Sequence, residues 1–128
     1  MRAANPNAVL NHVFEEDKGL PPEQQTTFPI SQLTAEERAF LLNVKNSTGT
    51  VTLYALHLGL GAPKNFTDDK GNPIAFQRDE KAPVIVGNKR PWKAECLNYL
   101  PARVMDDLAA LVLTGIDEGV NGSEAKNS

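Results

Sequence analysis

The chain has one cysteine, Cys96, among its 128 residues. A single cysteine cannot form a disulfide within the chain, and it leaves a cysteine-based zinc site three ligands short. No stretch approaches the roughly 18 apolar residues of a membrane-spanning helix, and the N-terminus lacks the apolar segment of a signal peptide. We therefore expect synthesis in a reducing cytoplasm, with no disulfide and no membrane partner.

The chain also has little net charge and few clusters of basic residues. The formal net charge is -3, and the basic residues gather only at Lys89, Arg90 and Lys93, around Trp92. A nucleic-acid-binding domain usually carries a basic stripe or patch that neutralises several phosphates. This distribution predicts no nucleic-acid partner.

Side chains suited to catalysis or metal binding are few. The histidine His57 has no serine or cysteine with a third orienting group at a recognisable spacing, so we interpret it as partly buried rather than catalytic. The adjacent Asp68 and Asp69 lack the alternating acids of a calcium loop, and Gly71 alone does not make a phosphate-binding loop. We expect no enzymatic activity, no bound metal and no cofactor.

The stretch "NFTDDKGNPIAFQRDE", residues 65–80, instead predicts a β-hairpin. Asp68 or Asp69 is placed to bond its own backbone, and Gly71 or Asn72 to adopt a positive φ. An aromatic residue then pairs across the turn with Ile74 or Phe76. The residues assigned to this structural turn are Asn65, Phe66, Asp68 and Gly71.

Length and composition predict one α+β domain, in which helices pack with a β-hairpin or small antiparallel sheet. The clearest helix begins at Thr34, whose side chain forms a capping box with Glu37. A second helix is expected within residues 49–61, and a third runs from Pro101 with a stripe of apolar residues at helical spacing. A short helical piece over 90–100 and a short strand over 84–86 complete the pattern. The predicted core comprises Phe40, Leu41, Val44, Tyr54, Leu58, Phe76, Leu97, Leu108, Leu111 and Val112.

The N-terminal residues are predicted to form an extended arm. Residues 26–30 alternate like a strand, and Pro29 places that strand at a sheet edge. Val13 and Phe14 offer a short partner strand, which gives an arm or hairpin across residues 9–32. The expected organisation is an arm over 1–32, a compact domain over 33–116 and a flexible tail over 117–128, with the arm ordering on a partner. The predicted partner-binding residues are Val13, Phe14, Leu20, Thr26, Phe28 and Ile30.

Three segments together resemble a known class of protein. They are "FEEDKGLPPEQQTTFPISQLT", "ALHLGLGAPKNFTDDKGNPIAFQRD" and "LNYLPARVMDDLAALVL", followed by a terminal "KNS". The arrangement is similar to small uncharacterised proteins encoded in the structural gene clusters of tailed bacteriophages, over most of residues 13–128. Matching arm positions are Asp17, Leu20, Pro21, Gln25, Thr26 and Phe28. The chain departs from these proteins at Ala62-Pro63-Lys64, where they tend to carry a tryptophan, and in a shorter acidic stretch before the final Lys-Asn-Ser.

The resemblance implies a non-enzymatic virion structural or assembly protein. Such a protein binds other phage structural subunits through its arm and surface, forms a homo-oligomer or part of a symmetric assembly, and is located in the virion. Two alternatives stay open. One is a tail assembly chaperone that leaves before the particle matures, and the other is a phage inhibitor of a host protein.

Overall fold

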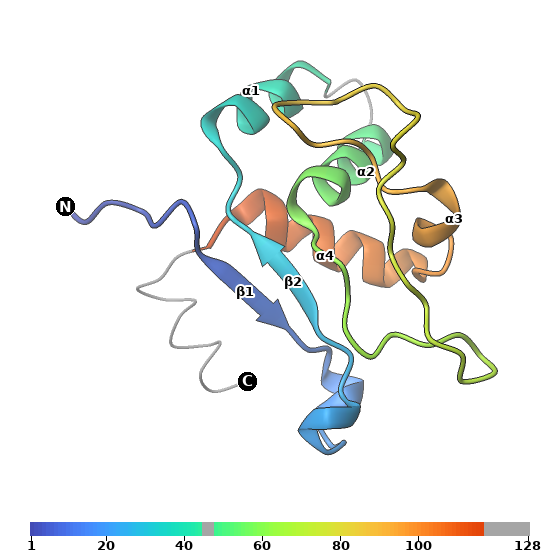
Figure 1. Cartoon of the computed structure of the whole chain (residues 1–128). Coiled ribbons are helices and arrows are strands. Elements are labelled where there is room, and N and C mark those ends of the chain that lie inside the picture. The colour runs from blue at the N-terminus through green and yellow to red at the C-terminus, as the bar shows by residue number, and fades with distance from the viewer. Residues whose placement is uncertain (45–47, 117–128) are drawn as a thin grey trace.

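The computed structural model describes residues 1–44 and 48–116 and shows a small α+β domain, as the sequence predicts. The predicted tail, residues 117–128, lies outside the described residues. Helices gather on one side of a two-stranded antiparallel sheet, and the first residues extend away from both (Figure 1). The elements in chain order are β1 (Val9–His12), η1 (Glu15–Asp17), η2 (Pro22–Gln24), β2 (Phe28–Ser31), α1 (Ala35–Asn43), α2 (Thr48–Gly59), α3 (Ala94–Leu97) and α4 (Ala102–Thr114).

The sheet corrects the predicted partner strand. β1 pairs with β2 in the register Leu10 opposite Ile30 and His12 opposite Phe28, so the partner strand lies at 9–12 and not at Val13 and Phe14. On its other side β2 bonds to residues 60–64, where the Gly61 amide donates to the Pro29 carbonyl over 2.8 Å. β2 is therefore flanked on both sides, and Pro29 does not mark a free edge.

The predicted boundary at residue 32 is also wrong. Phe28 and Ile30 point from β2 into the core and expose only 4% and 1% of their surface. Alternation in β2 buries these two side chains while Pro29 and Ser31 stay half exposed, as a strand with one covered face requires. The compact domain therefore begins at β1, and the residues that extend from it are those before Val9.

Local chemistry sets the limits of α1 and α4. The Thr34 hydroxyl accepts from the Glu37 amide over 3.1 Å, and a Glu37 carboxylate oxygen accepts from the Thr34 amide over 2.8 Å, so the predicted capping box is confirmed. α4 follows Pro101, as predicted, and ends at Gly115, which adopts a φ of 84°. Glycine tolerates this left-handed conformation without the steric penalty of a side chain.

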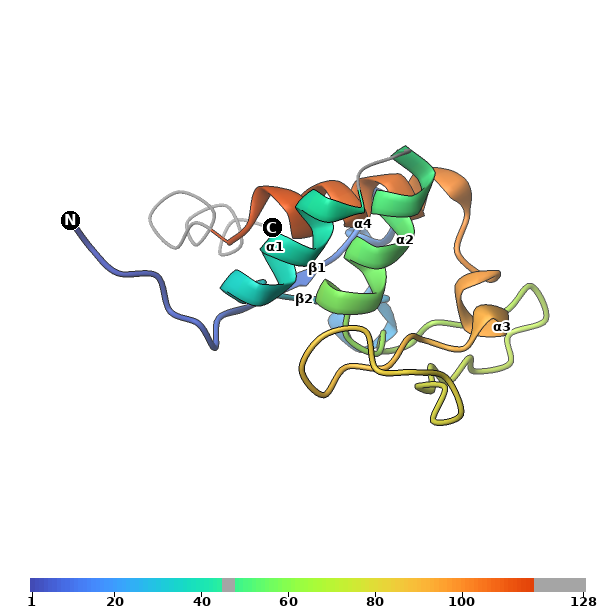
Figure 2. The same cartoon turned by 90° about the horizontal axis from the view of Figure 1, so that it is seen from above.

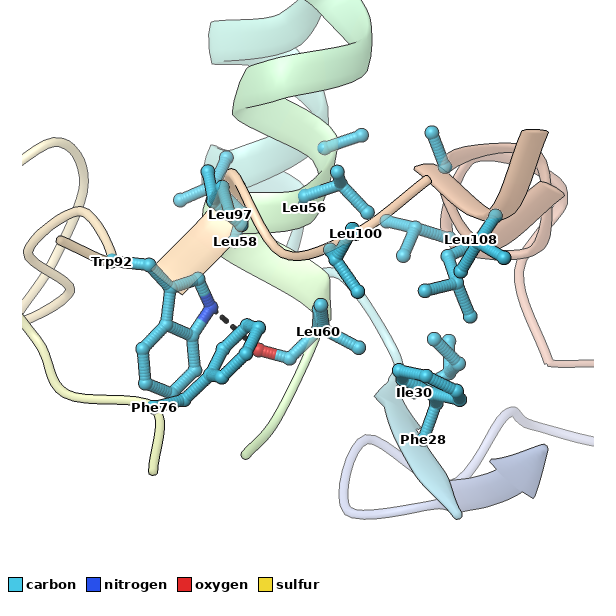
Figure 3. Packing of buried hydrophobic residues seen from close by; sticks show 14 of the residues in the cluster. Phe28, Ile30, Leu56, Leu58, Leu60, Phe76, Trp92, Leu97, Leu100 and Leu108 are labelled. Carbon is cyan, nitrogen blue, oxygen red and sulfur yellow. Dashed lines mark hydrogen bonds between the residues drawn. The ribbon is translucent and has the colours of Figure 1, made fainter. Parts of the chain in front are cut away.

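The core forms where α2 and α4 cross (Figure 2). Gly59, near the end of α2, packs directly on Val112, and a Cβ atom at Gly59 would lie only 2.7 Å from the Val112 Cγ2. Leu56, Leu58 and Leu108 surround this crossing and are almost completely buried (Figure 3). Every predicted core residue is either buried here or packs against the buried cluster. The buried residues also include Trp92, Cys96, Leu97 and Leu100, as the pattern at 90–100 indicates.

Residues 61–93 have no helix or strand and are joined by isolated bridges. The hairpin turn is present at 66–74, where Thr67 pairs with Pro73 and the Ile74 amide donates to the Phe66 carbonyl over 2.8 Å. The predicted strand over 84–86 is absent, because Val86 pairs only with Lys89 across a tight turn. No helix among the described residues is long and apolar enough to cross a membrane.

Candidate interaction surface

The predicted structural turn has a wider role than reversing the chain. Asp68 Oδ1 accepts from the amides of Lys70 and Asn72, each over 2.9 Å, and Gly71 has a φ of 83°. These amide bonds hold the pKa of the exposed Asp68 carboxyl below its ordinary value. Asn65 adopts a φ of 58° and donates from its amide group to the carbonyl of Glu23 over 2.9 Å. The turn therefore also fastens the chain before β2.

The predicted partner-binding residues differ in how far they are exposed to solvent. Phe28 and Ile30 belong to the core, so their side chains are not available to a partner in this fold. Phe14 packs edge-on against Phe28 with a centroid distance of 5.6 Å, and Phe66 contacts Phe28 from another side. Of the six residues, Leu20 is the exposed one, at 42% of its surface.

The remaining two, Val13 and Thr26, are half-buried. The Thr26 amide donates to the Asp17 carboxylate over 2.8 Å, and its hydroxyl donates to the Asn65 carbonyl over 2.8 Å. The connection between β1 and β2 is thus bonded to the rest of the domain. Residues 9–32 are therefore part of the domain rather than a free arm, although Val9 and Leu20 stay exposed.

The C-terminal end of α2 is bonded by side chains from a distant loop. A helix leaves its last carbonyl groups without partners in the helix, and cations are favoured near them. Arg78 Nη1 donates to the His57 carbonyl over 2.6 Å, and Lys89 Nζ donates to the Leu58 carbonyl over 2.5 Å. Trp92 Nε1 donates to the Leu60 carbonyl over 3.1 Å (Figure 3). These three bonds dock residues 78–92 onto α2.

His57 joins this docking through its ring. Its Nδ1 accepts from the Trp92 amide over 3.0 Å, which places the proton of the neutral ring on Nε2. Burial, with a smaller contribution from the positive charge of Arg78, lowers the pKa of His57 from 6.5 to about 4. His57 is thus a neutral structural histidine at neutral pH, in accord with its partly buried prediction.

A groove lies between the docked loop and the helices. We call it the α2 groove; its volume is 570 Å³, and it lies between α1 and α2 on one side and residues 83–91 on the other. The helix wall is Phe40, Thr50, Leu53, Tyr54 and His57, and the loop wall is Pro83, Val84, Ile85 and Pro91. Leu53 exposes 43% and Val84 41% of its surface. The groove thus presents apolar side chains to solvent.

A polar pocket of 460 Å³ borders the same loop. Arg78, Lys89 and Arg90 line it, and we call these three residues the basic cluster; Glu80 and Asn88 complete the lining. Lys89 pairs with the buried Glu37 carboxylate over 2.7 Å, so the capping residue of α1 also holds the loop. In the part of the chain that the structure describes, no carboxylate lies within 4 Å of Arg78 or Arg90.

Sequence patterns indicated only part of this surface. Lys89 and Arg90 were visible as a basic group, but Arg78 lies eleven residues earlier in the chain than Lys89, and nothing in the spacing signals that their side chains meet. Among residues 1–44 and 48–116, no three His, Cys, Asp or Glu side chains gather closely enough to hold a metal ion.

No protein-family model, curated protein or solved structure matches this chain.

Proposed function

We propose that the protein is a non-enzymatic component of a tailed-phage virion or of its assembly, and that it binds other virion subunits. The observation that carries the proposal is the gathering of exposed large apolar side chains beside hollows. Leu53 and Val84 lie at the α2 groove, while Leu42 and Leu113, exposed at 65% and 41%, line a second hollow of 330 Å³. Exposed apolar surface of this kind is typical of protein contacts.

The resemblance to phage structural-cluster proteins supports the phage context. This resemblance depends partly on the turn at 65–71, whose residues hold other segments of the domain together. Asn65 bonds residues 23–25, and Phe66 contacts both Phe28 and Phe76. The shared segments therefore include residues that build the fold. Partner contact falls to the helical surface and its loop, because the predicted arm residues Phe28 and Ile30 are buried.

Mass spectrometry of gradient-purified phage particles from infected cells tests this function. The protein should be present at a fixed ratio to the major structural subunits, and negative-stain images of particles lacking it should show a defined structural defect. Its absence from particles, together with recovery from infected lysate in complex with a tail subunit, would indicate a tail assembly chaperone instead. Recovery with a host protein alone would overturn the proposal in favour of an inhibitor.

A further inference from the structure

We propose that the basic cluster and the α2 groove together bind an acidic segment of a partner protein, with its carboxylates on Arg78 and Arg90 and its apolar side chains in the groove. The inference rests on the proposed function only in taking the occupant to be a protein. It adds the chemistry of that protein, which neither composition nor resemblance indicates.

Lys89 of the basic cluster is paired with Glu37, but Arg78 and Arg90 have no carboxylate within 4 Å among the described residues, although Glu80 lines the same pocket. Arg78 and Arg90 hold the loop by donating to the carbonyls of His57, Arg90 and Ala82. Donation to a carbonyl needs only an N–H group, and an uncharged amide side chain would supply it. Taking a full positive charge out of water without a counter-charge is unfavourable, and so paired arginines are the rule in partly buried positions. The arginines therefore present charge for which the described chain offers no carboxylate within 4 Å.

Arg78 is the clearer case. Its guanidinium lies 3.7 Å from the centroid of the Trp92 ring, which compensates part of the charge through a cation–π contact. Burial nevertheless lowers its pKa below the ordinary value, and Glu37, the acid that opposes this effect, already pairs with Lys89. A carboxylate oxygen arriving beside Arg78 and Arg90 would supply the missing charge and accept their remaining N–H groups.

The groove and the cluster are built in part from the same loop, where Arg90 lines the polar pocket and the next residue, Pro91, lines the groove. Arg90 precedes Pro91 in the chain and bonds the carbonyl of Ala82, which precedes Pro83, and both prolines line the groove. Arg78 bonds the carbonyl of His57, whose ring lines the groove from the helix side. A single extended segment that binds both hollows would pass over residues 90 and 91, where the cluster and the groove meet in the chain. The chain as a whole carries a net charge of -3, so the basic cluster is a local positive site on an acidic protein.

Fluorescence anisotropy with short labelled peptides tests this chemistry. The probe is a peptide of alternating leucine and glutamate, and its matched control has glutamine at each glutamate position. The glutamate peptide should bind with an affinity that weakens as salt rises, and the glutamine peptide should bind at least about tenfold more weakly. Equal binding of the two peptides, or no binding of either up to about 1 mM, overturns the proposal.

Four variants assign the contact. Arg90→Gln should weaken the glutamate peptide about tenfold, and Arg90→Lys should recover part of the affinity because it keeps the charge but not the guanidinium's several N–H donors. Lys81→Gln, on the same loop but outside the pocket, should bind like the parent, and Val84→Ser should weaken both peptides. Circular dichroism of each variant shows whether the fold is kept, and if Arg90→Gln unfolds, the comparison of the glutamate and glutamine peptides on the parent at increasing salt decides instead.

Competition with inorganic phosphate distinguishes a site for an acidic protein segment from a general anion site. If phosphate displaces the glutamate peptide at equal concentration, the cluster is an anion site only and the proposal fails. The test is independent of particle composition. If Arg90→Gln is incorporated into virions normally, the acidic partner is contradicted and the proposed function is not. If the protein binds the glutamate peptide but is absent from virions, the proposed virion function is contradicted and the acidic partner is not.

Discussion

Acidification should destabilise the protein through His57. The pKa of this histidine is lowered from 6.5 to about 4 in the folded chain, while the unfolded chain keeps the ordinary value. Between these two pH values the unfolded state binds more protons than the folded state. The contribution of neutral His57 to the free energy of unfolding is therefore fully present above pH 6.5 and is lost as pH falls towards 4. At about 1.4 kcal/mol for each tenfold change in proton affinity, the upper limit is about 3 kcal/mol. Because the ring is only half-buried and partly solvated, we expect a loss of about 1 to 2 kcal/mol.

The variant His57→Asn isolates this effect. An asparagine Oδ1 takes the position of Nδ1 and accepts from the Trp92 amide, but it does not titrate in this range. Thermal melts of both proteins at pH 7 and pH 5 should show the parent losing about 3 to 8 °C more than the variant. His12, whose pKa is also lowered by burial, serves as the second comparison through His12→Gln. If the parent and His57→Asn lose the same number of degrees on acidification, the coupling of His57 protonation to stability is refuted.

Four further predictions concern the fold. Gly59→Ala should destabilise the protein by about 1 to 3 kcal/mol in urea unfolding, because the new methyl group meets Val112, and Val112→Ala in the same chain should recover part of the loss. Leu108→Ala should cost about 2 to 5 kcal/mol, and a variant that unfolds at the parent's urea concentration would contradict the buried position of this residue. Asp69→Asn should leave stability unchanged, and calcium or magnesium should not raise the melting temperature. Deleting residues 1–24 removes β1 and should lower the melting temperature by several degrees, whereas a deletion ending before Ala8 should leave it unchanged.

Elements fixed by neighbouring residues were the ones that the sequence predicted well. The capping box of α1 depends on two side chains three residues apart, and the apolar stripe of α4 repeats within one helix. The turn at Asp68 and Gly71 likewise depends on local backbone bonds and one positive φ. Each of these features is determined by residues close together in the chain, so the local sequence is enough to predict it.

Features that depend on distant partners were predicted poorly. Val13 and Phe14 have strand-forming side chains, yet Val9–His12 forms the strand, because register is decided by the pairing with β2. The sequence alone predicts Phe28 and Ile30 at a partner surface, because their own segment offers nothing to bury them. α4 and residues 60–64, which lie far along the chain, supply the cover. The candidate surface has the same property, since Arg78 and Lys89 find their acceptors in the last turn of α2, and Trp92 finds its acceptor at Leu60, directly after α2.

The position of β2 between early and late parts of the chain has a consequence for biosynthesis. A ribosome releases the chain from its N-terminus, and contacts between distant segments form only once both segments have emerged. Phe28 and Ile30 leave the ribosome long before Leu108 and Val112, which complete the core around them. The nascent chain therefore carries uncovered apolar side chains until translation has passed α4, and a message truncated before that helix yields a product unable to bury them.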